Sequence, residues 1–398
     1  MAACCFVNVR GQGSVPCTDS RLDGAAYHHP LSTIHHPAGT PRQQGSRKPA
    51  SAIGTHRVRR LIQPVVTMAI AILLPVSIAA QWAPPRTPDG QPDLQGVWLD
   101  MSVTPLERPK ALGDRRFLTD AEVSQLKQRA ERLFNNRESD FIPGDNLFLA
   151  LWADADAVHN PNATGSVLNM VPRDFDNRTS LVTDPPDGRL PPVTPEGRRR
   201  QSEGLASNLT QPWQFGAAPS AAPQPARRVP SGPEDLSNVL RCISWGVPKI
   251  AGNINYTSHQ EIVQSPGYVV ILSEVNHEAR IIPLDGRPHL AAGLPQWNGD
   301  SRGRWEGNTL VVETTNFSPR SYFMGSAEGL HLVERFTRTS PNTLDYQLTI
   351  DDPATWTRPW TALIRLKSSE ERLHEFACHE GNHHVIRGIL GGARAEEK

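Results

Sequence analysis

From about residue 240 onward, the chain is a series of short segments in which apolar and polar side chains alternate. The alternation is clearest in 343–350, where leucine, tyrosine, leucine and isoleucine are separated by aspartate, glutamine and threonine. A period of two places one type of side chain on each face of a strand. The pattern predicts strands at 268–274, 279–284, 304–306, 309–317, 330–338, 343–350, 360–366 and 373–378, and the short turns between them are typical of an antiparallel meander.

We therefore expect a mainly β fold, either an antiparallel barrel of the lipocalin type or a β-sandwich. Residues 241–398 would form the β core, and the Pro-rich region 81–240 would wrap around it as long loops within the same domain. In that region a capping box formed by Thr119 and Glu122 predicts one flanking helix at 119–135.

The stretch 297–317 holds two tryptophans, two turn signals and a long β-branched run. The Gly-Asn pair at 307–308 predicts a hairpin turn, and the run after it predicts a strand. On that strand Glu313 shares a face with Val311 and Phe317. A carboxylate on an apolar face is either paired internally or part of a site.

Residues 1–80 differ in composition from the rest of the chain. They contain eight of the 41 Lys and Arg residues and two of the 41 Asp and Glu residues, which leaves 33 basic and 39 acidic side chains for the remainder. Arginines at 57–60, an apolar run at 65–78 and small residues after it are typical of a secretory signal peptide. We expect 1–80 to be an unstructured leader plus this signal peptide, with an uncleaved anchor as the alternative. The mature chain would be periplasmic or secreted, without a membrane span.

The mildly acidic body argues against nucleic acid as a partner. The sequence has no phosphate-binding loop, no dinucleotide-binding glycine motif and no Gly-x-Ser-x-Gly motif. We therefore expect no cofactor, and a small molecule as the partner.

Only Cys242 and Cys378 lie outside the leader. Two cysteines in an exported chain most simply form a disulfide with each other. Two buried free thiols are the alternative.

Several predicted strands place a carboxylate in register with apolar side chains, as Glu334 lies in register with Leu332 and Phe336. A buried carboxylate must meet a cation, share a proton or meet water. Two hypotheses follow: internal salt bridges, or a polar ligand pocket in which a carboxylate acts as an acid or base.

Histidines and charged residues near predicted turns complete the candidate site. We expect Asp300 and Arg302 to lie in a turn at one barrel mouth, and His289 to reach them if the loop 286–297 folds back. Alternatively, Asp300 and Arg302 only fasten the turn. The predicted catalytic residues are His277, Glu313, Glu334 and Asp300, and the predicted substrate-binding residues are Arg302, His289, Trp305 and Glu306.

A formal His-Glu-x-x-His string occupies 379–383. A zinc site of that type needs the string on a helix, and Gly381 and Asn382 in its middle are poor helix residues. No metal is therefore predicted, with a looser site of His379, His383 and His384 as the alternative.

Longer motifs run through the mature chain, namely Leu-Asp-Gly-Arg-Pro-His at 284–289, Gly-Asp-Ser-Arg-Gly-Arg-Trp-Glu-Gly at 299–307, Glu-Arg-Phe-Thr-Arg at 334–338, Thr-Trp-Thr-Arg-Pro-Trp at 355–360 and Cys-His-Glu-Gly-Asn at 378–382. With them the chain resembles a large family of exported bacterial proteins that has no assigned activity. The resemblance covers nearly all of the chain after the signal peptide and implies export. Similar proteins often carry Tyr at the position of His383, which argues against the zinc motif.

The leading hypothesis from the sequence is an exported, metal-independent enzyme that acts on a small molecule by acid–base chemistry, as a lyase, isomerase or hydrolase, in a barrel pocket. The density of His, Asp, Glu and Arg over 274–306 favours it. The alternative is a ligand-binding or carrier protein without catalysis.

Overall fold

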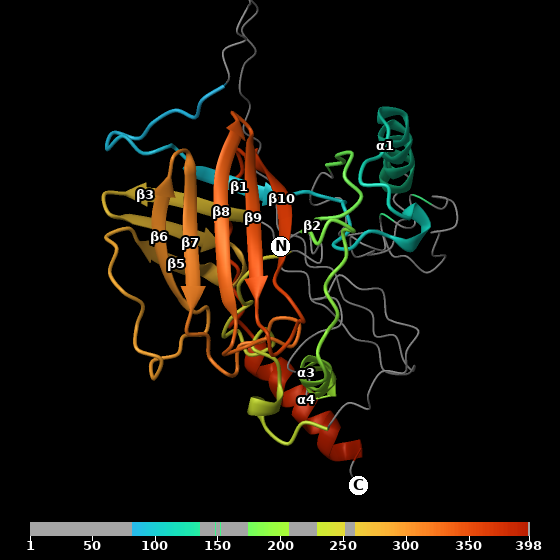
Figure 1. The fold of residues 1–398 in the computed structure, drawn as a ribbon. Helices are drawn as coiled ribbons and strands as arrows, with labels where there is room; N and C mark the ends of the chain where they lie inside the picture. Colours follow the sequence, from blue (N-terminus) through green and yellow to red (C-terminus); the bar gives the residue numbers. More distant parts are fainter. Residues whose placement is uncertain are drawn as a thin grey trace, which may run out of the picture. The chain divides into compact units, whose positions relative to one another are not determined.

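Neighbouring strands pair antiparallel in one continuous series that nearly closes into a barrel (Figure 1). The computed structural model describes residues 82–135, 148, 152, 174–206, 229–250 and 259–396, which belong to the unit Val76–Lys398. The leader and signal peptide predicted at 1–80 lie outside the described residues. The prediction of a mainly β fold is confirmed, and its barrel form is the one observed.

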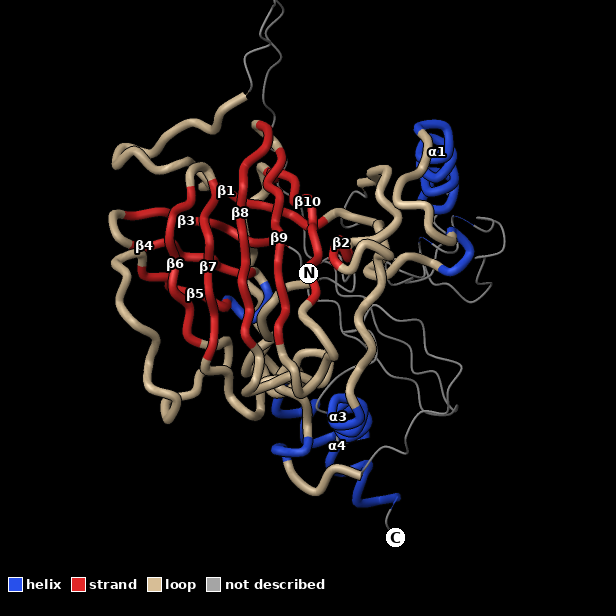
Figure 2. Tube along the Cα trace, viewed as in Figure 1, coloured by secondary structure: helices blue, strands red, loops and turns tan. Residues whose placement is uncertain are grey.

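Around the barrel the strands are β5 (Glu278–Pro283), β4 (Tyr268–Ser273), β3 (His259–Ser265), β1 (Gly96–Asp100), β10 (Trp360–Ser369), β9 (Thr343–Asp351), β8 (His331–Ser340), β7 (Thr309–Thr315) and β6 (Asp300–Glu306). A short strand, β2 (Val182–Asp184), pairs with the first residues of β10. The helices described over their full length are α1 (Asp120–Asn135), α3 (Pro195–Ala206) and α4 (Asn382–Glu396), drawn in blue in Figure 2. Short 3-10 turns lie at η1 (Lys110–Leu112), η5 (Pro233–Asp235) and η7 (Val275–His277).

The strand number decides how the barrel closes. Nine strands that alternate in direction place the two end strands, β5 and β6, parallel to each other. The described sheet has no backbone ladder between them, so they meet through side chains. A Cβ atom on Gly303 of β6 would lie 2.8 Å from Ile282 Cγ2 and 2.6 Å from Leu284 Cδ2. The missing side chain of Gly303 therefore allows the two strands to approach closely.

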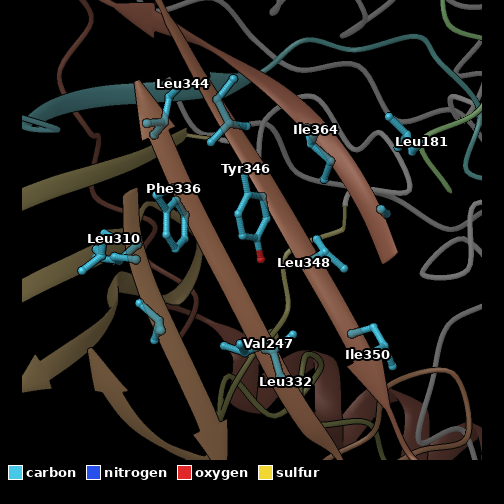
Figure 3. Packing of buried hydrophobic residues seen from close by; sticks show 14 of the residues in the cluster. Leu181, Val247, Leu310, Leu332, Phe336, Leu344, Tyr346, Leu348, Ile350 and Ile364 are labelled. Carbon is cyan, nitrogen blue, oxygen red and sulfur yellow. The ribbon is translucent and has the colours of Figure 1, made fainter. Parts of the chain in front are cut away.

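Apolar side chains from alternate positions fill the barrel (Figure 3). On β9, Leu344, Leu348 and Ile350 are fully buried. The rings of Phe336 and Tyr346 stack with centroids 4.7 Å apart and an interplanar angle of 13°. The predicted inward face of this strand is thus correct, and aromatic rings occupy the interior of the barrel.

The predicted flanking helix is also present. The backbone N–H of Thr119 donates to Glu122 Oε2 at 2.8 Å, and the N–H of Glu122 donates to Thr119 Oγ1 at 3.3 Å. This reciprocal pair is the capping box expected from the sequence. Leu118 and Leu126 pack into a second, smaller apolar cluster.

Several elements differ from the sequence prediction; β2 and α3, for example, were not predicted. Residues 300–303 form the start of β6 instead of a turn, and 373–378 form no strand. In the latter segment, the His374 N–H donates to Glu274 Oε2 at 3.1 Å, so a side chain replaces the neighbouring strand. β3 and α4 were not predicted, because β3 carries polar side chains on both faces and α4 contains three glycines.

No helix in the described part of the chain has both the length and the apolar character needed to cross a membrane.

The seam between β5 and β6 leads to the first prediction. We expect Gly303→Ala to lower the free energy of unfolding by about 1–3 kcal/mol, because the new methyl group overlaps Ile282 and Leu284. Gly293→Ala is the matched control, since a Cβ atom there meets nothing within 4 Å. Urea unfolding of both variants measures the effect. Equal stability of the two variants would show that the seam is not close-packed.

Candidate functional site

A cleft opens at the barrel end where β6 begins and β7 ends. Its walls come from three segments: 238–247 before β3, Trp297 before β6, and the connection 317–330 between β7 and β8. It encloses about 460 Å³, counting the part open to solvent. The aromatic lining residues are Trp245, Trp297, Phe317, Tyr322 and Phe323, and the polar ones include Asn238, Ser244, Ser321 and Ser326.

The aromatic wall of the cleft continues into the barrel core. Phe323 stacks on Trp360 with centroids 6.5 Å apart, and its centroid is 6.4 Å from that of Trp356. Trp356 and Trp360 are fully buried and pack edge to face. The floor of the cleft is therefore set by the packed core, which holds it in place.

Hydroxyl groups connect the cleft walls to one another. Ser321 Oγ donates to the Trp297 carbonyl at 2.5 Å, and Ser244 Oγ donates to Asn298 Oδ1 at 2.7 Å. These bonds join the segment before β6 to the walls on either side of it. The cleft is thus shaped before any ligand arrives.

Helix α3 supports the wall that carries Tyr322. A Cβ atom on Gly204 would lie 2.5 Å from Tyr322 Cε2, so the helix approaches the ring as closely as a glycine allows. Gln201 Nε2 donates to the Met324 carbonyl at 2.8 Å. Burial raises the pKa of Tyr322 well above its ordinary value, so the phenol stays neutral at physiological pH.

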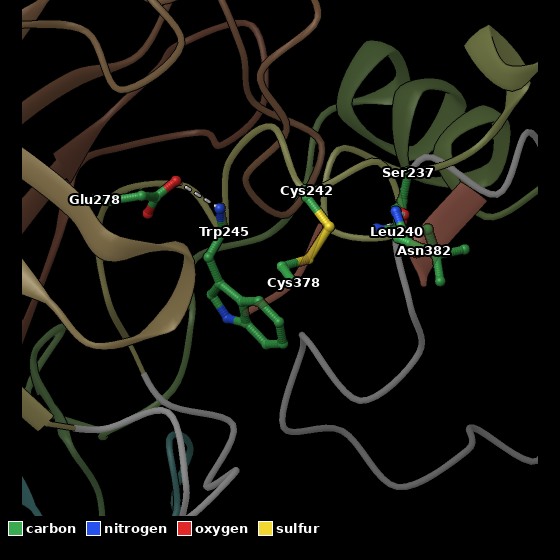
Figure 4. Close-up of a disulfide and its surroundings, with 7 residues drawn as sticks. All are labelled: Ser237, Leu240, Cys242, Trp245, Glu278, Cys378 and Asn382. Carbon is green, nitrogen blue, oxygen red and sulfur yellow. Dashed lines mark hydrogen bonds between the residues drawn. A yellow bond between two sulfur atoms is a disulfide. The ribbon is translucent and has the colours of Figure 1, made fainter. Parts of the chain in front are cut away.

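A disulfide joins Cys242 in one cleft wall to Cys378, with the Cα atoms 5.8 Å apart (Figure 4). The predicted pairing is confirmed. Nearby, Asn382 Nδ2 donates to the Leu240 carbonyl at 2.8 Å, so the start of α4 is tied to the same wall. The wall also contacts the barrel, because the Trp245 N–H donates to Glu278 Oε1 at 2.7 Å.

The charged groups inside the barrel form a closed network instead of lining the cleft. Arg280 on β5 contacts Glu334 on β8 at 3.0 and 2.5 Å, and the Tyr346 hydroxyl donates to Glu334 at 2.7 Å. Arg280 also donates to Ser301 Oγ at 3.1 Å and Thr314 Oγ1 at 3.3 Å. The predicted interior position of Glu334 is confirmed, and the arrangement is the internal salt bridge of the first hypothesis.

The electrostatics of this network agree with a structural ion pair. Burial alone would lower the pKa of Arg280, but the charge and hydrogen bonds of Glu334 outweigh it and raise that pKa. Burial and the Glu334 charge together raise the pKa of Tyr346 well above its ordinary value. Arg280 therefore remains charged and Tyr346 remains a neutral donor.

His289, Asp300 and Arg302 do meet, but on the outside of the barrel. His289 Nδ1 lies 3.0 Å from Asp300 Oδ2, and Arg302 Nη1 donates to Asp300 Oδ1 at 2.6 Å. Since β5 and β6 are parallel, the connection 284–299 must return along the barrel, which brings His289 to the start of β6. Arg302 Nε also donates to the Pro288 carbonyl at 3.0 Å, so the cluster fastens this crossing loop.

Asp300 is held ionised in that cluster. Burial would raise its pKa, but hydrogen bonds from the Leu290 N–H, Arg302 and His289 outweigh burial and lower it. A carboxyl whose folded pKa is depressed stabilises the protein above its unfolded pKa. That contribution is lost as the pH falls through the folded pKa.

The predicted inward position of Glu313 is wrong, and His277 makes no described contact with the Asp300 cluster. His277 Nε2 lies 3.2 Å from the His374 carbonyl, in a contact separate from the Asp300 cluster. Glu313 points outward and pairs with His331 at 2.8 Å, with both side chains about 40% exposed. The cause is the parity of β7, whose inward positions are Leu310, Val312 and Thr314; Val311 is buried on the outer face.

Trp305 and Glu306 are also displaced from the predicted site. They lie at the other end of β6 from Asp300, about 20 Å away at the usual strand rise. Trp305 packs on the barrel core. Glu306 is exposed and pairs with Arg304 and Arg335. They do not meet Asp300 because residues 300–306 form one extended strand.

The alternative metal site does not assemble in the described chain, which contains no group of three metal-binding side chains. His379 and Glu380 lie in a turn, and Gly381 has a φ of 73°. α4 begins only at Asn382, so His379 and His383 do not share a helix face.

Sequence reasoning missed the residues that line the cleft. Trp245 and Tyr322 lie in loops without periodicity, so no strand or helix pattern marks them. A usable signal was the aromatic content of these loops, as in Ser-Tyr-Phe-Met-Gly at 321–325. Contiguous exposed apolar patches mark interaction or ligand-binding sites, whereas single exposed apolar residues do not.

Comparisons with known proteins do not assign a family. No family model matches the chain, and no curated protein matches it. Among solved structures, a mutant of the fluorescent protein UnaG is similar at 15% identity, over 34% of this chain and 87% of that chain, with a TM-score of 0.21. A likeness this weak supports no argument, so the assignment of the barrel rests on its strand pairing.

The interior ion pair gives the second prediction. Glu334→Gln should lower the free energy of unfolding by about 3–5 kcal/mol, because Arg280 would remain as an uncompensated buried charge. Glu313→Gln, which breaks an exposed pair, should cost at most about 1 kcal/mol. Chemical denaturation compares the two. Similar losses of stability in both variants would contradict the role of Glu334 as the partner that compensates the buried charge of Arg280.

The contact between α3 and Tyr322 gives the third prediction. Gly→Ala in a helix normally gains about 1 kcal/mol, and Gly388→Ala in α4 should show this gain because its Cβ atom meets nothing within 4 Å. Gly204→Ala should lose stability instead, because the methyl group overlaps the Tyr322 ring. Thermal unfolding measures both. A gain in Gly204→Ala equal to the control would show that α3 does not support the cleft.

Proposed function

We propose that this chain is an exported ligand-binding or carrier protein that holds a small, uncharged, ring-containing molecule in the cleft. The observation that carries the proposal is the chemistry of the lining. Five aromatic residues line a preformed space, and the described lining contains no His, Asp, Glu, Lys or Arg.

Aromatic rings with a few neutral polar groups favour flat or ring-shaped neutral ligands. Such rings offer a large contact area at a low cost in conformational entropy. A charged ligand would lose its hydration without gaining an ionic partner in the cleft. The ligand class is therefore neutral, either an aromatic compound or a sugar ring that stacks on an aromatic side chain.

The same lining explains why binding is favoured over acid–base catalysis. A general acid or base must titrate near the working pH and lie within hydrogen-bond reach of the substrate. Tyr322 is the ionisable side chain of the described lining, and its raised pKa keeps it protonated. The charged residues expected to do chemistry are engaged with one another elsewhere.

Export is the second part of the proposal. The signal-peptide pattern at 57–80 supports it. The disulfide between Cys242 and Cys378 also supports it, because such bonds persist in oxidising compartments.

Calorimetric titration with indole, methyl glucoside and indole-3-acetate tests the ligand class. We expect saturable 1:1 binding of at least one neutral probe, and binding of indole-3-acetate weaker by about tenfold or more. Trp297→Ala should weaken the neutral probe about fivefold or more, as stacking on one ring contributes about 1 kcal/mol. Trp82→Ala is the control, since Trp82 is exposed and lies outside the lining.

Two outcomes would contradict the proposal: absence of saturable binding with both neutral probes, or equal losses in Trp297→Ala and Trp82→Ala. Recovery of the bound probe chemically unchanged after long incubation separates a carrier from an enzyme.

A further inference from the structure

A second pocket lies beside β2 and is lined by different residues from the cleft. Three arginines dominate it: Arg108, Arg116 and Arg178. It encloses about 290 Å³, counting the part open to solvent, and its described lining contains no acidic side chain. The lining of this pocket is cationic, whereas the lining of the cleft is neutral and aromatic.

Arg108 is a buried cation that carries no described ion pair. It is 5% exposed, and its Nε donates to Thr179 Oγ1 at 2.9 Å. Within the described chain, its Nη2 donates to the Pro186 carbonyl at 3.5 Å. A Cβ atom on Gly188 would lie 2.8 Å from Nη2, so the loop at 184–188 packs directly on the guanidinium and holds it in place.

The other two arginines differ in how far they are neutralised. Arg178 is 7% exposed; its Nε donates to Asp176 Oδ2 at 2.7 Å and its Nη1 donates to the Leu363 carbonyl at 2.6 Å. Arg116 is exposed, takes part in no described ion pair and lies 6.0 Å from the centre of the Phe117 ring. The pocket thus combines one paired and two unpaired guanidinium groups.

The charges around Arg108 leave the pocket short of negative charge. Burial lowers the pKa of Arg108, and the neighbouring charges of Arg116 and Arg189 lower it further. Asp114 and Asp187 act in the opposite direction without cancelling the shift. In the barrel, by contrast, Glu334 fully compensates the buried Arg280.

We propose that this pocket binds a tetrahedral oxyanion, a phosphate or sulfate group, either free or as a monoester. Guanidinium groups make strong, charge-assisted hydrogen bonds to such oxygens. Three guanidinium groups line one pocket, and a tetrahedral anion offers more oxygens for them to contact than a carboxylate does.

The site is independent of the proposed neutral cleft, so either assignment can fail without the other. A bound anion would also connect the segment 108–117 to 178–186 beside β2, because each segment supplies part of the pocket. It would therefore stabilise the folded arrangement of these two segments by mass action.

Calorimetric titration of the full mature chain with inorganic phosphate, sulfate, phenyl phosphate and succinate tests this site, at constant ionic strength to remove general screening effects. We expect saturable binding of phosphate and sulfate and a rise in the midpoint of thermal unfolding. Binding of phenyl phosphate as well would identify an ester as an acceptable source. Its failure to bind would restrict the site to the free anion.

Arg116→Gln is the test variant, because Arg116 is exposed and its replacement leaves the buried packing intact. It should weaken phosphate binding about tenfold, as expected for one lost charge-assisted hydrogen bond. Arg115→Gln is the matched control: it removes the same charge one residue away, from a side chain that pairs with Glu122 outside the pocket. It should change binding less than about twofold.

Three results would overturn the proposal: no saturable binding of phosphate or sulfate, equal weakening in Arg115→Gln and Arg116→Gln, or tighter binding of succinate than of both tetrahedral anions.

Discussion

The ion pair between Arg280 and Glu334 is the interaction on which the closed barrel depends. The seam between β5 and β6 has no described backbone ladder, so side chains must supply what hydrogen bonds supply at the other seams. Arg280 spans this seam from β5, donating to Ser301 on β6 and pairing with Glu334 on β8. Gly303 provides the space that lets the two end strands approach.

A parallel seam has a second consequence, because the chain must cross the length of the barrel to pass from β5 to β6. The crossing segment is fastened outside the barrel by His289, Asp300 and Arg302, and its far end supplies Trp297 to the cleft. Charged residues that look catalytic in the sequence therefore serve to close the barrel and secure the connection between β5 and β6. The cleft that remains at the barrel end is neutral.

The cleft and the arginine pocket differ in the chemistry of their linings. In the cleft, aromatic rings continue into a packed core, and the hydroxyl groups of Ser244 and Ser321 are used to connect the walls. Beside β2, Arg108 and Arg116 have no carboxylate partner among the described residues, whereas Arg280 in the barrel has Glu334. Shape and ring stacking would select the ligand in the first pocket, and charge would select it in the second.

The sequence by itself determined the local structure. A period of two identified β9, a reciprocal capping box located the start of α1, and two cysteines outside the predicted leader implied one bond. The strand and the helix start depend on residues close in sequence. The disulfide depends on the number of cysteines, because two cysteines can pair in only one way. Glu334 was also placed correctly, because its neighbours on both sides of the same face are apolar.

Only the tertiary structure decided where the faces and loops lie relative to one another. On β7 both Val311 and Val312 are buried, so alternation could not tell which face, and hence whether Glu313, points inward. The direction of the closing seam depends on the total number of strands, and β3, with its polar side chains, was missing from the predicted set. The cleft and the arginine pocket each gather side chains from segments that lie far apart in sequence and have no shared period. Such sites arise from packing between segments that lie far apart in sequence, and no local sequence pattern predicts that packing.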